Sequence, residues 1–295
     1  RLQVFSDIQQ SLALGGLTRG VTNEELNAAY ASIANGGTYI KPKLYTKVVD
    51  HDGNVILDNT QPDSRQVIKE TTAWLLTSAM QDVVTEGTGA SVNFGNMAIA
   101  GKTGTTSDYN DVWFSGYTPY YTATTWTGYD NNVKLRKGEE RSLAKKLWRA
   151  VMSKIHEELP SASFQMPASG IVQATVCARS GKLPIAGLCD GTLKTEYFAE
   201  GTVPTDSCDV HYQGSICQYS NLPACEQCPF KVDGVLELTP IEDPVLQQGS
   251  SVTQQVTAED GSVSTVVVPG NETNTCPHNA EFMAQPGIEG IIEQQ

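Results

Sequence analysis

Positive charge is scarce in this sequence of 295 residues. Its 20 Lys and Arg residues stand against 33 Asp and Glu, and the resulting net charge of −13 excludes nucleic-acid binding through a basic face. No Lys or Arg follows Lys231, whereas ten acidic residues do, so ten acids less one lysine account for −9 of the −13. The sequence therefore divides into a nearly neutral main part and an acidic tail.

Long hydrophobic runs are also absent, because no apolar stretch approaches the roughly 20 residues of a membrane-spanning helix. No signal peptide is recognisable, and the first residues, Arg1-Leu-Gln-Val, include neither an initiator methionine nor a helix cap. We therefore expect the sequence to be cut from a longer protein, about whose membrane anchor this absence says nothing. With 39% hydrophobic and 18% charged residues, a packed core is expected.

The first 158 residues combine helical and strand patterns. Thr22 and Glu25 have the spacing of a capping box and predict a helix that ends at Gly36-Gly37. Asp52-Gly53 predicts a hairpin turn between strands at 39–49 and 55–57. Further helices are predicted over 69–84 and 142–157. The last helix is expected to bury an apolar side formed by Leu143, Leu147, Ala150, Val151 and Ile155.

Three successive strands are predicted over 98–106, 112–117 and 121–129, joined by short turns. Short connections favour an antiparallel meander, and together with the helices they predict an α+β fold in which an antiparallel sheet packs with helices. We assign 1–158 to this domain, 169–230 to a cysteine-rich module and 231–295 to the acidic tail. Within the tail, alternating residues at 251–256 and 262–268 around Asp260-Gly261 predict a further hairpin.

All seven cysteines lie between Cys177 and Cys276. Such clustering indicates either disulfides outside the cell or a metal site. Cys225-x-x-Cys228, with Cys217, His211 and Cys276-x-His278 nearby in the sequence, would suit zinc, but the spacing is irregular. We therefore favour disulfides, with at least one thiol left over, and predict no metal site and no cofactor. His51, in a turn, and His156, at a helix end, are expected to be solvated.

The segment 98–106 contains the candidate binding residues of the first domain. Lys102, Thr103 and Thr105 bring an ammonium group and two hydroxyls onto one short strand, and Gly104 removes a side chain where a ligand backbone would pass. This combination suits an edge strand that binds an extended peptide and its carboxylate. The alternative is an ordinary exposed edge strand. Four nearby aromatic residues are expected to belong to the core rather than to a substrate platform: Trp113, Phe114, Tyr117 and Trp126.

Three stretches resemble the bifunctional class A penicillin-binding proteins. They are Ala100-Gly-Lys-Thr-Gly-Thr-Thr106, Asp111-Val-Trp-Phe-Ser-Gly-Tyr-Thr-Pro119 and Thr125-Trp-Thr-Gly-Tyr-Asp130, and the resemblance extends over roughly residues 10 to 158. Ser180-Gly-Lys-Leu183 is similar to the region that follows the transpeptidase domain in these proteins. The resemblance implies a D,D-transpeptidase on the extracytoplasmic face of a bacterial membrane. Its substrates would be peptidoglycan stem peptides ending in D-Ala-D-Ala, and β-lactams would bind by imitation.

In that family the motifs run S-x-x-K, S-x-N and then K-T-G. Ser142-Leu-Ala-Lys145 follows Lys102 instead of preceding it, and Ser91-Val-Asn93 lies too close before it. The resemblance therefore implies that the nucleophilic serine is missing here, and that the chain alone is inactive without an N-terminal part of the same protein.

By the same resemblance, the strand residues take specific roles. Lys102 would supply positive charge at the site, and the backbone N–H of Thr105 would donate to the oxyanion. The peptide would be bound by Thr103, Gly104, Thr105 and Thr106. The alternative function is a β-lactam sensor or a non-catalytic wall-binding module, and a β-lactamase is less favoured because of the long appended tail.

Overall fold

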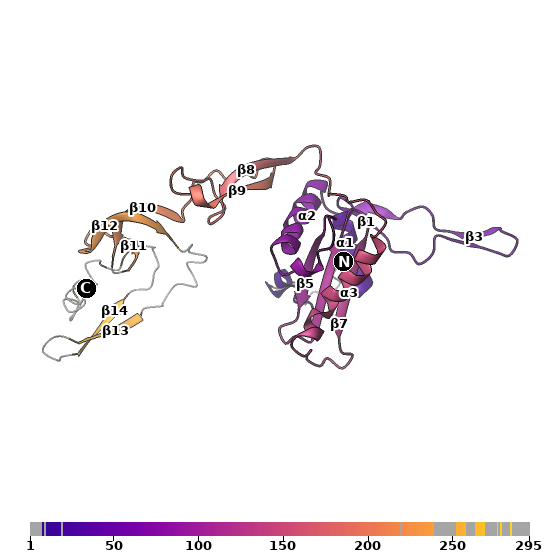
Figure 1. Cartoon of the computed structure of the whole chain (residues 1–295), viewed down its shortest axis with the longest axis horizontal. Coiled ribbons are helices and arrows are strands. Elements are labelled where there is room, and N and C mark those ends of the chain that lie inside the picture. Colours follow the sequence, from indigo (N-terminus) through magenta and orange to yellow (C-terminus); the bar gives the residue numbers. More distant parts are fainter. Residues whose placement is uncertain are drawn as a thin grey trace. The chain divides into compact units, whose positions relative to one another are not determined.

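The computed structural model describes residues 8, 10–18, 20–218, 220–238, 252–257, 263–268, 276, 278 and 284, with only the backbone for 252–257 and 263–268. The chain forms two compact units, Arg1–Ile171 and Val172–Gln295 (Figure 1). The three-part division at 158, 169 and 231 stays a prediction. No helix among the described residues is long and apolar enough to cross a membrane.

The helices of unit 1 begin close to where the sequence predicts them. After the short helix η2 (Gln10–Leu14), α1 spans Asn23–Ala34, and its capping box is formed. The hydroxyl of Thr22 accepts the Glu25 N–H at 3.2 Å, while the Glu25 carboxylate accepts the Thr22 N–H at 2.8 Å. The other helices are α2 (Glu70–Thr85), η3 (Ala90–Val92) and α3 (Glu139–Ile155).

Two small antiparallel pairs lie between α1 and α2. Strand β1 (Thr38–Ile40) pairs with β4 (Ser64–Gln66), and β2 (Lys47–Val49) pairs with β3 (Val55–Asp58). The predicted turn is present, because Gly53 has a φ of +84° and the Asp50 carboxylate accepts the N–H of Asn54 at 2.8 Å. The prediction of one strand over 39–49 is wrong: β1 and β2 are separate and have different partners. The β2–β3 hairpin projects from the rest of unit 1 (Figure 1).

The main sheet is a three-stranded antiparallel meander. Its strands are β5 (Ala100–Thr105), β6 (Asp111–Tyr117) and β7 (Thr122–Gly128), in that spatial order. Lys102 pairs with Ser115 and Thr105 with Val112, which fixes the register of the edge strand. The α+β fold with an antiparallel sheet is thus confirmed. The sheet is held in place by α2 beside β5 and by α1 and α3 against β6 and β7.

The core of unit 1 is centred on Trp148 of α3, which is fully buried. Its ring meets the ring of Phe114 edge-on with centroids 5.1 Å apart, and its Nε1 donates to the Ala123 carbonyl at 3.0 Å. The buried cluster around these rings includes Val84, Val92, Ile99, Val112, Leu135, Ala144 and Met152. Residues from α2, α3 and the sheet therefore share one core.

The buried face of α3 differs from the prediction. Ala144, Trp148 and Met152 form the buried stripe, with spacing of four residues. The predicted stripe is one residue away: Leu143, Leu147, Val151 and Ile155 are 46–48% exposed. The two stripes have the same helical period, so periodicity alone did not separate them, and the large Trp148 ring takes the inward position.

His156 is buried at 6% exposure, so the expectation that it is solvated is wrong. Its Nδ1 lies 2.6 Å from the Met152 carbonyl and its Nε2 lies 2.8 Å from the Thr118 hydroxyl. The Thr118 hydroxyl also accepts the N–H groups of Tyr120 and Tyr121, both at 3.1 Å. The imidazole thus ties the end of α3 to the β6–β7 turn. His51, in contrast, is exposed as expected.

Unit 2 consists of short strands and turns. Strand β8 (Ile171–Cys177) pairs with β9 (Leu193–Ala199), with η4 (Asp190–Thr192) just before β9. Strand β10 (His211–Cys217) lies between β11 (Leu222–Pro223) and β12 (Lys231–Glu237). The predicted tail hairpin is confirmed by β13 (Val252–Thr257) and β14 (Val263–Val268), while its turn at Asp260-Gly261 lies outside the described residues.

All seven cysteines are free thiols, so the preference for disulfides is not borne out. Six of them gather with two histidines into two compact groups instead. The first group consists of Cys177, Cys189, Cys208 and His211, and the second of Cys217, Cys228, Cys276 and His278. The irregular spacing in the sequence concealed these groups, because the turns of unit 2 bring distant residues together.

Candidate functional site

Strand β5 lies at one edge of the main sheet and pairs with β6 alone among the described strands. This confirms the predicted edge strand. An edge strand presents backbone N–H and C=O groups along its outer side, to which an extended peptide can add as a further strand. Lys102, Thr103, Gly104 and Thr105 all belong to this strand, so the structure brings four of the predicted site residues together.

Lys102 and Gly104 share one face of the sheet because side chains alternate along a strand. Lys102 is exposed, and its Nζ donates to the carbonyl of its neighbour Thr103 at 3.0 Å. A Cβ added at Gly104 would lie 3.2 Å from the Cβ of Trp113 on β6, which is a tight contact. The glycine therefore serves the packing of Trp113 as well as leaving the strand open.

The side chain of Thr103 lies on the opposite face of the sheet, where its hydroxyl contacts another part of unit 1. Its Oγ1 is 3.0 Å from Oγ1 of Thr88, in the loop that follows α2. Lys145 of α3 donates to the Thr88 carbonyl at 3.0 Å and so fixes this loop. The hydroxyl of Thr103 is therefore held in a defined position by a chain of contacts from α3.

The two remaining threonines differ in their surroundings. Thr105 is exposed at the last position of β5. The hydroxyl of Thr106 accepts the N–H groups of Asn110 and Asp111 at 3.1 and 3.0 Å and closes the β5–β6 turn. Because its hydroxyl already bonds this turn, Thr106 holds the end of the strand in shape.

The four aromatic residues fall into two groups. Phe114 and Tyr117 are fully buried, as expected for core residues, and burial raises the pKa of Tyr117 to about 12 although its hydroxyl lies 2.7 Å from that of Thr77. Trp113 and Trp126 are less buried: they lie on the face of Lys102, which Tyr117 shares, with ring centroids 6.3 Å apart, and Trp126 is 38% exposed. The core expectation is therefore wrong for Trp126. Its Nε1 donates to the Asp111 carboxylate at 2.9 Å.

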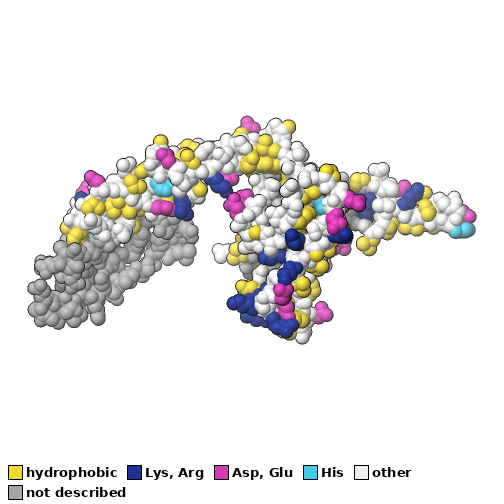
Figure 2. Space-filling model, viewed as in Figure 1, with side chains coloured by type: hydrophobic (Ala, Val, Ile, Leu, Met, Phe, Trp, Pro, Cys, Tyr) yellow, Lys and Arg dark blue, Asp and Glu magenta, His cyan; other side chains and the backbone are white. Residues whose placement is uncertain are grey.

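A basic segment that sequence reasoning missed lies at the Thr105 end of the sheet. Exposed Lys134, Arg136 and Lys137 follow β7, and Lys and Arg side chains gather at this end of unit 1 (Figure 2). The segment is attached to the β5–β6 turn because the Leu135 N–H donates to the Tyr109 carbonyl at 2.9 Å. The run Lys-Leu-Arg-Lys was visible in the sequence, but its place beside β5 depends on this tertiary contact.

Comparison with known proteins shows to which family this chain belongs. The family model described as penicillin binding protein transpeptidase domain matches residues 3–153, and the one described as penicillin-binding protein 1A, C-terminal domain, matches residues 167–213. The chain belongs to the penicillin-binding protein transpeptidase family. Penicillin-binding protein 1A of Clostridium botulinum is 41% identical over 211 residues, which are 70% of this chain and 25% of that protein. The chain thus spans about a quarter of the length of this curated relative.

Among the solved structures that resemble the chain are two further penicillin-binding proteins. A crystal structure of penicillin-binding protein 1A from Haemophilus influenzae aligns with a TM-score of 0.56 and 24% identity, over 64% of this chain and 33% of that one. The penicillin-binding protein PonA1 from Mycobacterium tuberculosis aligns with a TM-score of 0.50 and 26% identity, over 55% and 44% of the two chains. The first similarity establishes the fold.

The S-x-x-K sequence at 142–145 has a structural role within the transpeptidase fold. Ser142 donates its hydroxyl hydrogen to the Glu139 carbonyl at 2.9 Å, in the first turn of α3. Lys145 donates to the Thr88 carbonyl, as described above. Both groups serve the helix and the loop beside it. A hollow of about 750 Å³ lies elsewhere, between α1 and the β1–β4 pair, and β5 contributes none of its lining residues.

Proposed function

We propose that this chain forms one wall of the active site of a peptidoglycan D,D-transpeptidase. The observation that carries the proposal is the K-T-G sequence on the open edge of the sheet, in a segment that matches the transpeptidase family. The reaction is acyl transfer: a serine attacks the carbonyl of the D-Ala-D-Ala peptide bond, D-alanine leaves, and an amine of a second stem peptide attacks the acyl-enzyme. That serine would be supplied by a segment that precedes Arg1.

The contribution of β5 is to hold the acyl donor. The backbone N–H of Thr105 would donate to the oxyanion that forms on the attacked carbonyl, and Lys102 would add positive charge on the same strand. The hydroxyls of Thr103 and Thr105 would donate to the terminal carboxylate. A β-lactam would use the same donors, because its carboxylate and carbonyl imitate those of the dipeptide.

Two features of the surface around β5 support an anionic, extended ligand. The open edge offers main-chain groups to a peptide in the strand direction. The basic segment at Lys134, Arg136 and Lys137 adds positive charge at the Thr105 end, although Arg136 is partly neutralised by Glu140, whose carboxylate accepts the Nε–H of its guanidinium at 2.5 Å. Attraction of carboxylates by this end would raise the rate of encounter more than the strength of binding.

The exposed stripe of α3 supports the proposal that a further segment packs against this domain. Leu143, Leu147, Val151 and Ile155 present a continuous apolar strip on the outer side of the helix. An uncovered apolar strip of this kind marks a surface that binds protein. We assign this strip as the surface that binds the segment preceding Arg1, which brings the serine.

We place the complete enzyme on the outer face of a bacterial membrane, because the family acts on the cell wall.

The test is covalent labelling by a fluorescent penicillin. We expect no label on the 295-residue chain alone, and stable label when the chain is produced with the residues that precede Arg1 in its gene. Labelling of the isolated chain would show that a nucleophile is present in it. Absence of label from the extended protein, with its fold shown intact by circular dichroism, would overturn the transpeptidase proposal.

A further inference from the structure

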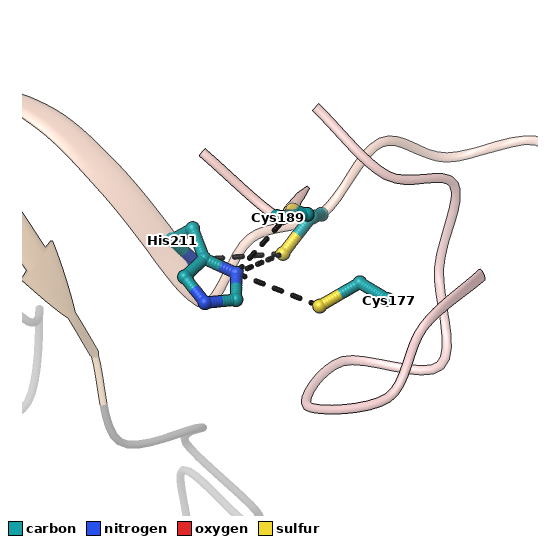
Figure 3. A group of neighbouring side chains, drawn as sticks. Cys177, Cys189 and His211 are labelled. Carbon is teal, nitrogen blue, oxygen red and sulfur yellow. Dashed lines mark hydrogen bonds between the residues drawn. The ribbon is translucent and has the colours of Figure 1, made fainter. Parts of the chain in front are cut away.

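Three cysteine sulfur atoms converge on a single nitrogen in the first group of unit 2. Nδ1 of His211 lies 3.5 Å from Sγ of Cys177 and 3.3 Å from that of Cys189 (Figure 3). It also lies 3.4 Å from Sγ of Cys208. The four atoms all lie within 4.8 Å of one another. The residues come from the end of β8, the turn before η4, the loop before β10 and the first position of β10.

Hydrogen bonding does not explain this convergence. An imidazole Nδ1 has either one proton to donate or one lone pair to accept with, so it serves one partner well and not three. Four ligands around a tetrahedral zinc ion, at about 2.3 Å for sulfur and about 2.0–2.1 Å for nitrogen, place each sulfur about 3.5 Å from the nitrogen. The three distances in the first group, 3.3–3.5 Å, match this edge length.

The surroundings of the sulfur atoms suit thiolates. The Ile185 N–H donates to Sγ of Cys189 at 3.3 Å, and the His211 N–H donates to Sγ of Cys208 at 3.5 Å. All three cysteines of the first group are buried. Buried thiolates need a compensating positive charge, which a divalent cation between them would provide.

The second group repeats the same donor set from different elements. Cys217, Cys228, Cys276 and His278 are all buried, and their ligand atoms again lie within 4.8 Å of one another. Sγ of Cys217 lies 3.4 Å from Nδ1 of His278, a residue 61 positions further along the chain. This group would therefore fasten Cys276 and His278 to the end of β10.

The core of unit 2 gives a reason for such sites. Of the described buried residues, one cluster consists of three cysteines and Val210, and the other consists of three cysteines. The described part of unit 2 has little aliphatic core, and a small unit of that kind needs disulfides or a structural metal to remain folded. A disulfide within either group would pair two sulfurs and leave the third buried thiol without a partner, whereas a metal ion uses all three.

We propose that unit 2 binds two structural zinc ions, each held by three cysteines and one histidine. Three thiolates with one imidazole in a closed tetrahedral arrangement favour zinc over harder cations. The assignment also accounts for the odd number of cysteines: six are ligands, and Cys225 is the seventh. Sγ of Cys225 lies 3.2 Å from Sγ of Cys276, too far for a disulfide bond of about 2.05 Å.

Metal analysis of the purified 295-residue chain tests the proposal, with Cys225→Ser as the matched control. We expect two zinc ions per chain, one in Cys189→Ser, one in Cys228→Ser and two in Cys225→Ser. Exchange of zinc for cobalt(II) should produce the thiolate charge-transfer absorption and intense visible bands of a tetrahedral site. A chain without metal, whose mass shows cysteines joined as disulfides, would overturn the proposal. A single zinc ion that is retained in Cys228→Ser would overturn the second site.

A second readout separates the two units. All four tryptophans, Trp74, Trp113, Trp126 and Trp148, lie in unit 1. Removal of zinc by a strong chelator should therefore leave the tryptophan fluorescence melting curve unchanged, while trypsin cuts unit 2 at Lys182 and Lys194 at least tenfold faster. Equal cutting rates with and without chelator would show that the metal has no structural role.

Discussion

The hydroxyl oxygens of Thr103 and Thr88 lie 3.0 Å apart and connect the K-T-G strand to the loop after α2. A hydroxyl has one hydrogen but can accept twice, so if Thr88 donates to Thr103, the hydrogen of Thr103 stays available for a ligand carboxylate. We expect Thr103→Val to slow penicillin acylation of the extended protein about tenfold and Thr88→Val about threefold. Stopped-flow labelling measures both rates. Equal effects would mean that Thr103 acts only through the loop.

Gly104 and Gly101 lie on the same strand but meet different neighbours. A Cβ at Gly101 would come within 2.7 Å of the Phe114 ring and 2.9 Å of the Ser115 carbonyl oxygen, whereas the nearest neighbour of one at Gly104 would be Trp113, at 3.2 Å. We therefore expect Gly101→Ala to lower the free energy of unfolding by about 2 kcal/mol and Gly104→Ala by less than about 1 kcal/mol. Urea unfolding measures both.

The Gly104→Ala variant also distinguishes a packing role of this glycine from a binding role. If the open strand at Gly104 admits the substrate backbone, Gly104→Ala should still slow penicillin acylation at least tenfold in spite of its small effect on stability. Acylation at the wild-type rate in a stably folded Gly104→Ala protein would remove this residue from the binding site.

Lys102 has an exposed side chain whose described hydrogen bond is to the neighbouring Thr103 carbonyl. Its replacement by alanine should therefore change the free energy of unfolding by no more than about 0.5 kcal/mol. If Lys102 supplies charge near the developing oxyanion, as we propose, acylation of the extended protein should fall at least a hundredfold in this variant. Lys137→Ala, which removes an exposed lysine of the basic segment, is the control and should slow acylation less than threefold at physiological salt.

Local patterns in the sequence predicted the elements of the main sheet and its helices, because capping boxes, turn glycines and alternation are properties of neighbouring residues. Which face of α3 is buried was not predictable in this way. Leu143 and Ala144 begin two stripes of equal period, and the choice is made by the position of Trp148 against Phe114. The burial of His156 likewise depends on Thr118, which is 38 residues away in the sequence.

The limit of local sequence patterns also applies to the candidate sites. The K-T-G strand was found because its four residues are contiguous. In the first cysteine group Cys177 and His211 are 34 positions apart, and the four residues show no repeated short spacing. Only the turns between β8 and β10 bring them to one nitrogen, and a sequence pattern does not contain that information.

The raised pKa of Tyr117 makes unit 1 sensitive to alkaline pH. Burial favours the neutral phenol, so its pKa is about 12 in the folded state against about 10 in the unfolded chain. The stabilisation is fully present below pH 10 and is lost as the pH rises through 12. The total loss in the free energy of unfolding is about 3 kcal/mol. In Tyr117→Phe this loss should be absent. Urea midpoints at pH 9, 10 and 11 for both proteins give the difference, and parallel pH profiles would contradict it.

The Thr118–His156 pair should contribute more to stability than its place in a turn suggests. The Thr118 hydroxyl bonds the His156 ring and accepts the N–H groups of Tyr120 and Tyr121, so its loss would leave buried polar groups without a partner. We expect Thr118→Val to lower the free energy of unfolding by about 2–3 kcal/mol. Thr124→Val, which removes one half-buried contact with Ser115 at 3.0 Å, is the matched control and should cost about 1 kcal/mol. Chemical denaturation of the two variants decides the point, since equal losses would show that His156 needs no partner at Thr118.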